Sequence, residues 1–454
     1  MIVSFSVSNF RSFSSEQTFS LVASHRLSGS HEDHAISIPG SSEKVLKIGV
    51  LYGANGAGKS NLFKALRYLK SVALHLRTKS TGTGREAFCL GSRSDEPSTF
   101  DLQFVIADKL YRFGFKVDDQ RITEEWLLEV IGSRERVLYE RTTTKDGNVS
   151  VEAHWPPGTS PKLAALTTVG GPQNQSFLAT LQTTLEKSDL GEELSSILFW
   201  FNNSLTFVAP NAPFKSLGAM LATDTNFKDF TNDFLKSSST GVDSLQIEKQ
   251  EITEAELYNI LPEGMLPGHL ERLRYGRDTA ATIRLGDGSE IMLEATPDNH
   301  YYKIAIQAAH AHPAGHFVPL DLKEESDGTR RLINLLPALY GLHASTQVYV
   351  IDEVDRSMHP ALVWKFLEFF LRSPDTRQRQ IIVTTHESHL LDLDLLRRDE
   401  IWFAEKDSSA STHLYPLTDF KVRKDLEIRK HYLQGRFGAV PFLGNIEQLL
   451  ADPI

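Results

Sequence analysis

The stretch GANGAGKS, residues Gly53 to Ser60, is a complete P-loop (Walker A) pattern, G-x-x-x-x-G-K-S. It lies between an apolar segment with strand character, Ile48 to Tyr52, and a segment with helical spacing that begins at Asn61 and continues to Leu76. In such a setting small residues let successive backbone N–H groups turn toward phosphates, and the helix N-terminus adds its dipole. The sequence therefore predicts a strand–loop–helix unit that binds a nucleotide.

The individual residues of this loop have expected roles. Lys59 is expected to reach the β- and γ-phosphate oxygens, and Ser60 to offer its hydroxyl to Mg²⁺. The ligands predicted are therefore ATP and Mg²⁺. The loop residues expected to contact the nucleotide are Asn55, Gly56, Ala57, Gly58, Lys59, Ser60 and Asn61.

A second pair of polar residues follows the predicted strand Val348 to Ile351, namely Asp352 and Glu353. In P-loop enzymes the acid that closes an apolar strand holds Mg²⁺ directly or through water, and a following glutamate can polarise the attacking water. We therefore assign Asp352 to the metal and Glu353 to the general base. The alternative is a solvated acidic pair at a strand end.

The next predicted strand, Ile381 to Thr384, is followed closely by His386. A histidine just past the tip of a central strand lies near the γ-phosphate, where it can sense that group or orient the water. The catalytic residues predicted from the sequence are therefore Lys59, Glu353 and His386.

The segment Glu324 to Thr329 precedes a predicted helix, Thr329 to Tyr340. A serine and a glycine ahead of exposed helix N–H groups form an anion cradle. Ser326 or Asp327 could instead be an ordinary N-cap, and taken alone the segment favours that interpretation. Taken with the order P-loop, strand-Asp-Glu and strand-His, it is typical of an ABC-type ATPase head.

Composition limits the class of protein. The chain has 454 residues, 48 basic against 58 acidic, and a formal net charge of −10, so it is not a generally basic protein that coats nucleic acid. A single cysteine, Cys89, excludes an intramolecular disulfide, and packing is its expected role. The sequence shows no apolar run near 18 residues and no signal-peptide pattern, so we expect a cytoplasmic protein without a membrane segment.

Periodicity predicts the organisation of the chain. We expect three parts: 1–165, an ATPase lobe with the P-loop and an antiparallel β patch; 166–275, a mostly helical insertion; and 276–454, a lobe with the signature, the Walker B acid and the histidine. Alternation of strands and helices in the last part predicts a parallel sheet. The expected fold class is α/β. The resemblance of the motif order to ABC-type ATPase heads implies a P-loop head of that type with a mixed sheet, an antiparallel β subdomain and a mostly helical insertion.

Several other segments carry weaker predictions. Ile2 to Phe10 alternates as a half-buried strand, Ser28 to Glu43 is expected to be a surface loop, and Thr78 to Gly84 a loop of low order. Leu390 to Leu396 has helix-like spacing, and it contains Asp392-Leu393-Asp394, which mimics a nuclease motif. Only 68 residues (454 − 386) follow His386, too few for a separate nuclease domain of about 100 residues.

The histidines His310, His312 and His316 are interpreted as incidental members of a loop without nearby carboxylates, and no zinc site is predicted. The basic run from Lys421 to Lys430 is a possible DNA contact, with a solvated helix face as the alternative.

The motifs together resemble the AAA15/AAA21 group of ABC-type ATPases, relatives of the RecF, Rad50 and OLD heads. The residues that carry the resemblance are Ser8 to Phe13, Gly53 to Asn61, Glu325 to Thr329, Ile351 to Asp355 with His359 and Pro360, His386, and Tyr432 to Pro441. The resemblance covers nearly the whole chain and is weakest in the middle.

The resemblance implies further site residues. Arg11 and Ser12 would approach the nucleotide, and Asp355 would lie in the D-loop at a dimer seam. Ser326 and Gly328 would contact the γ-phosphate of a partner subunit. The signature here is Glu-Ser-Asp-Gly-Thr in place of Leu-Ser-Gly-Gly-Gln, so it departs from the family at Asp327.

The resemblance also implies a function. Proteins of this group assemble as homodimers or larger homo-oligomers with ATP between the protomers. Similar proteins act in anti-phage systems of the PARIS, Septu or AbiL kind, next to a separately encoded nuclease or Toprim-like effector. Two alternatives stay open, a RecF-like repair clamp that binds DNA and an ATP-bound scaffold of low turnover that sequesters a toxin.

Overall fold

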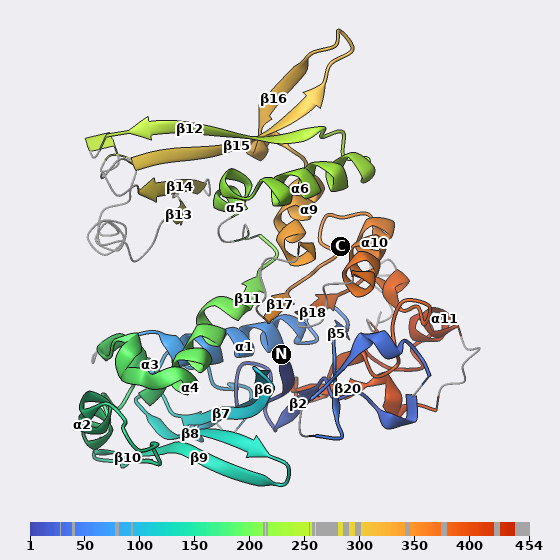
Figure 1. Ribbon diagram of the computed structural model, residues 1–454. Helices are drawn as coiled ribbons and strands as arrows, with labels where there is room; N and C mark the ends of the chain where they lie inside the picture. Colours follow the sequence, from blue (N-terminus) through green and yellow to red (C-terminus); the bar gives the residue numbers. More distant parts are fainter. Residues whose placement is uncertain are drawn as a thin grey trace, which may run out of the picture. The chain divides into compact units, whose positions relative to one another are not determined.

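The computed structural model describes residues 1–27, 29–38, 41–77, 81–91, 94–211, 214, 217–253, 255–256, 259, 280–284, 290–295, 301–340, 346–373, 379–421 and 427–440. The chain divides into two compact units (Figure 1). The first contains Met1–Val208, Ala344–Asp355 and Leu367–Ile454, and the second contains Ala209–His343 and Arg356–Phe366. The predicted three-part division at 165 and 275 stays a prediction.

A central sheet of mostly parallel strands organises the first unit. Its order is β11-β17-β18-β5-β19-β20, and only β20 runs antiparallel to its neighbour. The strands are β5 (Ile48–Tyr52), β11 (Leu205–Val208), β17 (Gln347–Ile351), β18 (Arg379–Thr385), β19 (Ile401–Lys406) and β20 (Thr412–Pro416). Short apolar runs form these strands because both faces are covered, as parallel sheets require. The predicted parallel sheet is confirmed.

The register of this sheet places the predicted motifs at one edge. Ile351 pairs with Val383, and Val383 pairs with Val50, so β17, β18 and β5 end side by side. The P-loop follows β5 and leads into α1 (Lys59–Leu74), and Pro360–Arg372 forms α10 after β17. The ends of all three strands are therefore available to a single site.

The second sheet of the first unit is antiparallel, in the order β10-β9-β8-β7-β6-β1-β2. Its strands are β1 (Ile2–Ser8), β2 (Gln17–Ser20), β6 (Ser98–Ile106), β7 (Lys109–Val117), β8 (Ile122–Ile131), β9 (Arg134–Thr143) and β10 (Val149–Ala153). The predicted antiparallel patch and the N-terminal strand are confirmed. Strand β2 was not predicted, because only four residues form it.

Gln380 joins the two sheets from inside β18. Its fully buried amide accepts a hydrogen bond from Ile2 N (2.7 Å) and donates to Ile2 O (2.8 Å) and Leu46 O (2.9 Å). A polar side chain in a buried strand is stable when its donors and acceptors are satisfied in this way. Gln380 thus ties β18 to β1 and to β4 (Lys44–Leu46).

Helices α2 (Pro161–Val169), α3 (Phe177–Thr184) and α4 (Lys187–Phe199) follow the antiparallel sheet, and a π-helix, Trp200–Ser204, leads into β11. Glu125 of β8 holds the start of α3 by accepting from Phe177 N (2.8 Å) and Leu178 N (3.2 Å). Burial raises the pKa of Glu125, and the N–H donors at the helix terminus compensate the buried carboxylate. The contact fixes α3 on the sheet.

The second unit combines a sheet in the order β12-β15-β14-β13 with helices. Its elements are α5 (Leu217–Thr223), α6 (Thr225–Ser237), β12 (Ser244–Ile252), β13 (Ala280–Arg284), β14 (Glu290–Ala295), β15 (Tyr301–Ala311), β16 (Phe317–Asp321) and α9 (Asp327–Leu339). Figure 1 shows β12 and β15 as long neighbouring strands, with the β15–β16 hairpin beyond them. The predicted helix before β17 is confirmed.

Some sequence expectations were wrong. The segment Ser28 to Glu43 is not only a surface loop, because β3 (Ala35–Ser37) pairs with β4 and the buried His34 Nδ1 lies 3.0 Å from Glu400 Oε1. A polar segment looked exposed because its buried partner is distant in sequence. The stretch Leu390 to Leu396 is not a helix, since a 3₁₀ turn, Ser388–Leu390, is followed by turns.

Two smaller expectations also fail. Cys89 is exposed, so it has no packing role in the core. His310 belongs to β15, not to a loop, and its Nε2 lies 2.6 Å from Glu325 Oε1. The carboxylate was missed because it lies in a different element.

Parts of other predictions lie outside the described residues. These parts are 78–80 of the low-order loop, residues 422–426 of the basic run, and Pro441. No helix within the described ranges is long and apolar enough to cross a membrane.

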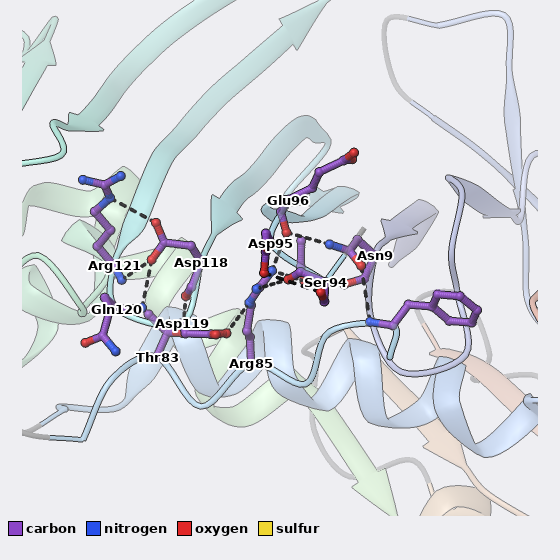
Figure 2. A network of polar contacts seen from close by, with 12 residues as sticks. Asn9, Thr83, Arg85, Ser94, Asp95, Glu96, Asp118, Asp119, Gln120 and Arg121 are labelled. Carbon is purple, nitrogen blue, oxygen red and sulfur yellow. Dashed lines mark hydrogen bonds and ion pairs between the residues drawn. The ribbon is translucent and has the colours of Figure 1, made fainter. Parts of the chain in front are cut away.

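Arg85 stabilises the chain between α1 and β6 (Figure 2). Its side chain is 2% exposed, and its guanidinium donates from Nε to Asp119 Oδ1 (2.6 Å), from Nη1 to Glu96 O (2.5 Å) and from Nη2 to Ser94 O (2.6 Å). Arg85 therefore connects the segment before β6 to the β7–β8 turn. A planar guanidinium suits this task because its donors point in fixed directions.

The neighbouring residues complete the network in Figure 2. Thr83 is buried, and its N–H donates to Asp119 O (3.0 Å). The carboxylate of Asp118 accepts from the backbone N–H groups of Gln120 and Arg121, both at 2.8 Å, and so fixes the β7–β8 turn. The expectation of low order is therefore wrong for residues 81–84.

We predict that Arg85→Met lowers the free energy of unfolding of the first unit by about 1–3 kcal/mol, because the Ser94 and Glu96 carbonyl groups and the Asp119 carboxylate lose a charged donor. Urea denaturation followed by tryptophan fluorescence measures the change. Arg134→Met is the matched control, since Arg134 is exposed at the start of β9. Equal unfolding midpoints for the two variants would contradict the role given to Arg85.

Candidate active site

The P-loop has a left-handed backbone at two glycines, with φ 77° at Gly56 and 108° at Gly58. A Cβ atom at Gly56 would meet nothing within 4 Å, so this side of the loop is open, whereas a Cβ atom at Gly58 would lie 2.1 Å from Thr412 Oγ1. Glycine is therefore required at Gly58 by both conformation and space. The loop ends at Gly58, and α1 begins at Lys59.

The side chain of Lys59 folds back over the loop. Its Nζ donates to Gly53 O (2.7 Å) and Ala54 O (3.1 Å) and lies 3.2 Å from His386 Nδ1. Lys59 is only 4% exposed, and burial lowers the pKa of Lys59 to about 8. The ammonium group is therefore held at the loop but still mostly protonated at neutral pH.

The contact with Lys59 determines the state of His386. An ammonium group has donors only, so His386 Nδ1 is the acceptor and a neutral ring carries its proton on Nε2. Burial and then the charge of Lys59 lower the pKa of His386, which favours the neutral ring. His386 thus offers one N–H donor from Nε2.

Asp352 and Ser60 lie together at the same edge of the sheet. Ser60 Oγ donates to Asp352 Oδ1 at 3.2 Å, and Asp352 is 4% exposed. A hydroxyl and a carboxylate oxygen are the ligands that Mg²⁺ prefers, and Mg²⁺ keeps several waters and phosphate oxygens beside them. The residues predicted for the metal therefore fit it.

Thr384 links the two acidic residues and was missed as a functional residue. Its Oγ1 donates to Asp352 Oδ1 (2.6 Å) and accepts from Glu353 N (2.8 Å). One hydroxyl therefore orients the carboxylate predicted to bind the metal and the backbone of the predicted general base. The available signal was its position at the tip of a buried strand, two residues before His386.

Glu353 itself has a left-handed backbone, with φ 47°, which is strained for a residue other than glycine. Val354 N donates to Thr384 O (3.0 Å), so the turn after β17 is held against β18. Asp355 Oδ2 lies 3.4 Å from His386 N. The acidic turn and the histidine turn are thus neighbours.

The N-terminal residues predicted to approach the nucleotide lie in different surroundings. Ser12 Oγ accepts from Asn61 Nδ2 at 2.7 Å, so Ser12 contacts the start of α1. The guanidinium of Arg11 instead forms an ion pair with Glu86. The buried rings of Phe10 and Phe13 anchor the loop that carries both residues.

The signature residues belong to the second unit. Ser326 is the N-cap of α9, with Thr329 N donating to Ser326 Oγ (3.1 Å), so the capping alternative is confirmed. A Cβ atom at Gly328 would lie 2.4 Å from Ser357 O, which explains why glycine is needed there. Contact of Ser326 and Gly328 with a nucleotide stays a prediction.

Comparisons with known proteins place the same residues in a family context. The family described as "AAA domain, putative AbiEii toxin, Type IV TA system" matches residues 48–392, which include the P-loop, Asp352 and His386. Two of the solved structures that are similar to this chain each share 13% sequence identity with it. The SMC head domain from Thermotoga maritima has a TM-score of 0.37 over 91% of this chain and 98% of that chain.

The second similar structure is the SmcHead bound to the C-winged helix domain of ScpA, with a TM-score of 0.41 over 91% of this chain and 97% of that chain. No curated protein matches the chain.

We predict that Thr384→Val lowers the rate of ATP hydrolysis by about 10–100-fold but changes the affinity for ATP by less than about threefold. The variant loses the bonds that orient Asp352 and Glu353, whereas the P-loop is intact. Phosphate release and titration with a fluorescent ATP analogue measure the two quantities. Thr384→Ser keeps the hydroxyl and should keep the rate; an unchanged rate in Thr384→Val would contradict the role of the hydroxyl.

We also predict that nucleotide affinity falls as the pH rises above about 8. The pKa of Lys59 is about 8 in the free protein, and bound phosphates favour the protonated ammonium, so binding above this pH takes up one proton. Below pH 8 Lys59 is already charged and the affinity should be level; above it, affinity should fall about tenfold per pH unit.

Calorimetric titration at pH 9 in two buffers of different ionisation enthalpy measures the proton uptake. Lys59→Arg is the control, because a guanidinium stays charged and should show no uptake. Absence of uptake in the wild type at pH 9 would show that Lys59 is not desolvated as described.

Proposed function

The chain belongs to the AAA_21 family of ABC-type ATPases, and from this premise we propose that it binds Mg·ATP at the P-loop of the first unit and hydrolyses it. The convergence of functional groups at the ends of β5, β17 and β18 carries the proposal. Lys59 Nζ is within 3.2 Å of His386 Nδ1, and Ser60 Oγ and Thr384 Oγ1 both reach Asp352 Oδ1. Such convergence of phosphate-binding, metal-binding and proton-accepting groups suits phosphoryl transfer.

The loop and its lysine would bind the phosphates. Lys59 would exchange the carbonyl oxygens of Gly53 and Ala54 for the β- and γ-phosphate oxygens. Ser60 would contact Mg²⁺, and Asp352 would hold it directly or through water. When bound, Mg·ATP supplies the electrophilic γ-phosphorus, and Mg²⁺ partly neutralises the negative charge on the phosphate oxygens.

The remaining residues would act on the attacking water. Glu353, whose backbone Thr384 holds, would accept a proton from that water. His386 would donate from Nε2 to a γ-phosphate oxygen, which the tautomer set by Lys59 allows. Both residues follow the ends of the paired strands β17 and β18, so the edge of the sheet holds them near each other. This would provide the preorganisation that phosphoryl transfer requires.

We further propose that two or more copies of the chain enclose the ATP. Ser326 is the N-cap of α9 and Gly328 lies in its first turn, a position that suits a γ-phosphate of another copy. Asp355, next to the histidine turn, would lie at the seam between copies. ATP would then hold the protomers together, and hydrolysis would release them.

The biological output would be the control of a separate protein. The family description names a toxin of a toxin–antitoxin system, and this context supports a role in anti-phage defence with a separately encoded nuclease or Toprim-like effector. Co-purification of the product of the neighbouring gene, with and without ATP, tests this part. A partner that binds equally with ATP and in its absence would exclude control by nucleotide.

We predict that Glu353→Gln binds ATP with nearly wild-type affinity but hydrolyses it at least about 100-fold more slowly, because the base is lost and the cradle is kept. In size-exclusion chromatography the variant should accumulate as an assembly larger than the monomer when ATP is present. Lys59→Ala should neither bind ATP nor assemble.

Glu152→Gln is the matched control for this variant, since Glu152 is exposed on β10, and it should hydrolyse ATP normally. Hydrolysis by Glu353→Gln at the wild-type rate would show that another group is the base. A monomeric Glu353→Gln protein that still binds ATP would exclude the shared nucleotide site.

A further inference from the structure

Thr412, at the start of β20, contacts the P-loop from a position 355 residues further along the chain. The residue is fully buried, and its Oγ1 donates to Ala57 O at 2.8 Å. The same oxygen lies 2.7 Å from Ser12 Oγ and is the nearest atom to a Cβ built at Gly58. Thr412 therefore packs against the turn of the loop between Ala57 and Gly58.

The bond to Ala57 determines how the next peptide group is oriented. In a trans peptide the C=O and the following N–H point in opposite directions in one plane, and the described residues contain no cis peptide. When Thr412 holds Ala57 O, the N–H of Gly58 must point away from Thr412. Gly58, with φ 108° and ψ 5°, has no side chain that could fix this plane itself.

The hydroxyl of Ser12 supports the same arrangement. Asn61 Nδ2 donates to Ser12 Oγ (2.7 Å), and Ser12 Oγ is paired with Thr412 Oγ1. This chain of hydrogen bonds joins the first turn of α1, the N-terminal loop and β20 around the P-loop. Hydrogen bonds in such a chain polarise one another, so the position of each hydroxyl is well defined.

A backbone contact keeps Thr412 in place independently of its hydroxyl. Thr412 N donates to Ser12 O at 2.7 Å, and β20 pairs with β19 along its length. Loss of the hydroxyl alone should therefore leave the strand where it is. This separates the effect of the hydroxyl on the loop from its effect on folding.

We propose that Thr412 is a positioning residue of the nucleotide site, whose hydroxyl fixes the Ala57–Gly58 peptide so that the Gly58 N–H is presented to the phosphates. The proposal rests on the ATP binding proposed above. A backbone N–H that is already aimed at a phosphate binds it without a cost of reorganisation. A residue that only filled space beside Gly58 would not need a hydroxyl.

The experiment compares Thr412→Val, Thr412→Ala and Thr412→Ser with the wild type. Titration with a fluorescent ATP analogue gives the Kd, and phosphate release gives KM and kcat. We expect the Kd and KM to rise about tenfold in both variants without a hydroxyl, with kcat within about twofold, because the lost interaction is made equally in the ground state and the transition state. Thr412→Ser should restore both constants.

Thr143→Val is the matched control. Thr143 is a buried threonine of β9 whose Oγ1 has no hydrogen-bond partner among the described residues, so the same substitution there should leave the Kd unchanged. The thermal midpoint of each variant reports folding. If Thr412→Val and Thr412→Ala have the same Kd, a steric clash of the extra methyl group of valine with the P-loop is excluded as the cause.

The outcomes separate this proposal from the function on which it rests. If the wild type does not bind the analogue, the proposed ATP binding fails. If the wild type binds it, Lys59→Ala does not, and the folded variants without a hydroxyl bind like the wild type, the role of Thr412 is overturned. If Thr412→Val does not fold, the Kd of Thr412→Ala is compared with that of the wild type instead, and an unchanged Kd overturns the role of Thr412.

Discussion

The in-register pairing of three parallel strands, β17, β18 and β5, is the constraint on which the site depends. The pairing is made by backbone hydrogen bonds and protected by apolar side chains on both faces, so the three strand ends are fixed relative to one another. Each end carries one part of the proposed site: the P-loop, the acids, and the threonine and histidine. A shift of one residue in β18 would direct Thr384 to the opposite face of the sheet and separate it from Asp352.

The two kinds of buried polar residue in the first unit differ in their partners. Gln380, Glu125 and Arg85 bind mainly backbone groups, and each connects elements that lie far apart in the sequence. Lys59 and Thr384 also bind backbone groups, but each contacts a side chain of the candidate site as well: Lys59 contacts His386, and Thr384 contacts Asp352. Gln380 and Thr384 lie on the same strand, so β18 both joins the two sheets and organises side chains of the candidate site. This explains how a strand that is buried along its whole length can contain several polar side chains.

Local patterns in the sequence predicted most of the fold and most of the first-unit site. Apolar runs gave β5, β17 and β18, and the P-loop and the Asp352-Glu353 pair follow directly from them. What the sequence could not reveal depends on contacts between distant segments. The buried His34–Glu400 pair made a polar segment look exposed, and nothing near Thr412 marks it as a neighbour of Gly58. The same reason explains why the Glu325 partner of His310 was missed.

The backbone of Glu353 has a consequence for how this protein can evolve. A left-handed conformation costs about 1–2 kcal/mol for a residue with a Cβ atom, and glycine would adopt it without that penalty. For the proposed general base, stability and activity therefore favour different residues at this one position. Selection for thermal resistance alone would favour glycine there, which under the proposed role gives a protein that binds ATP without hydrolysing it, so persistence of the glutamate would itself indicate selection for turnover.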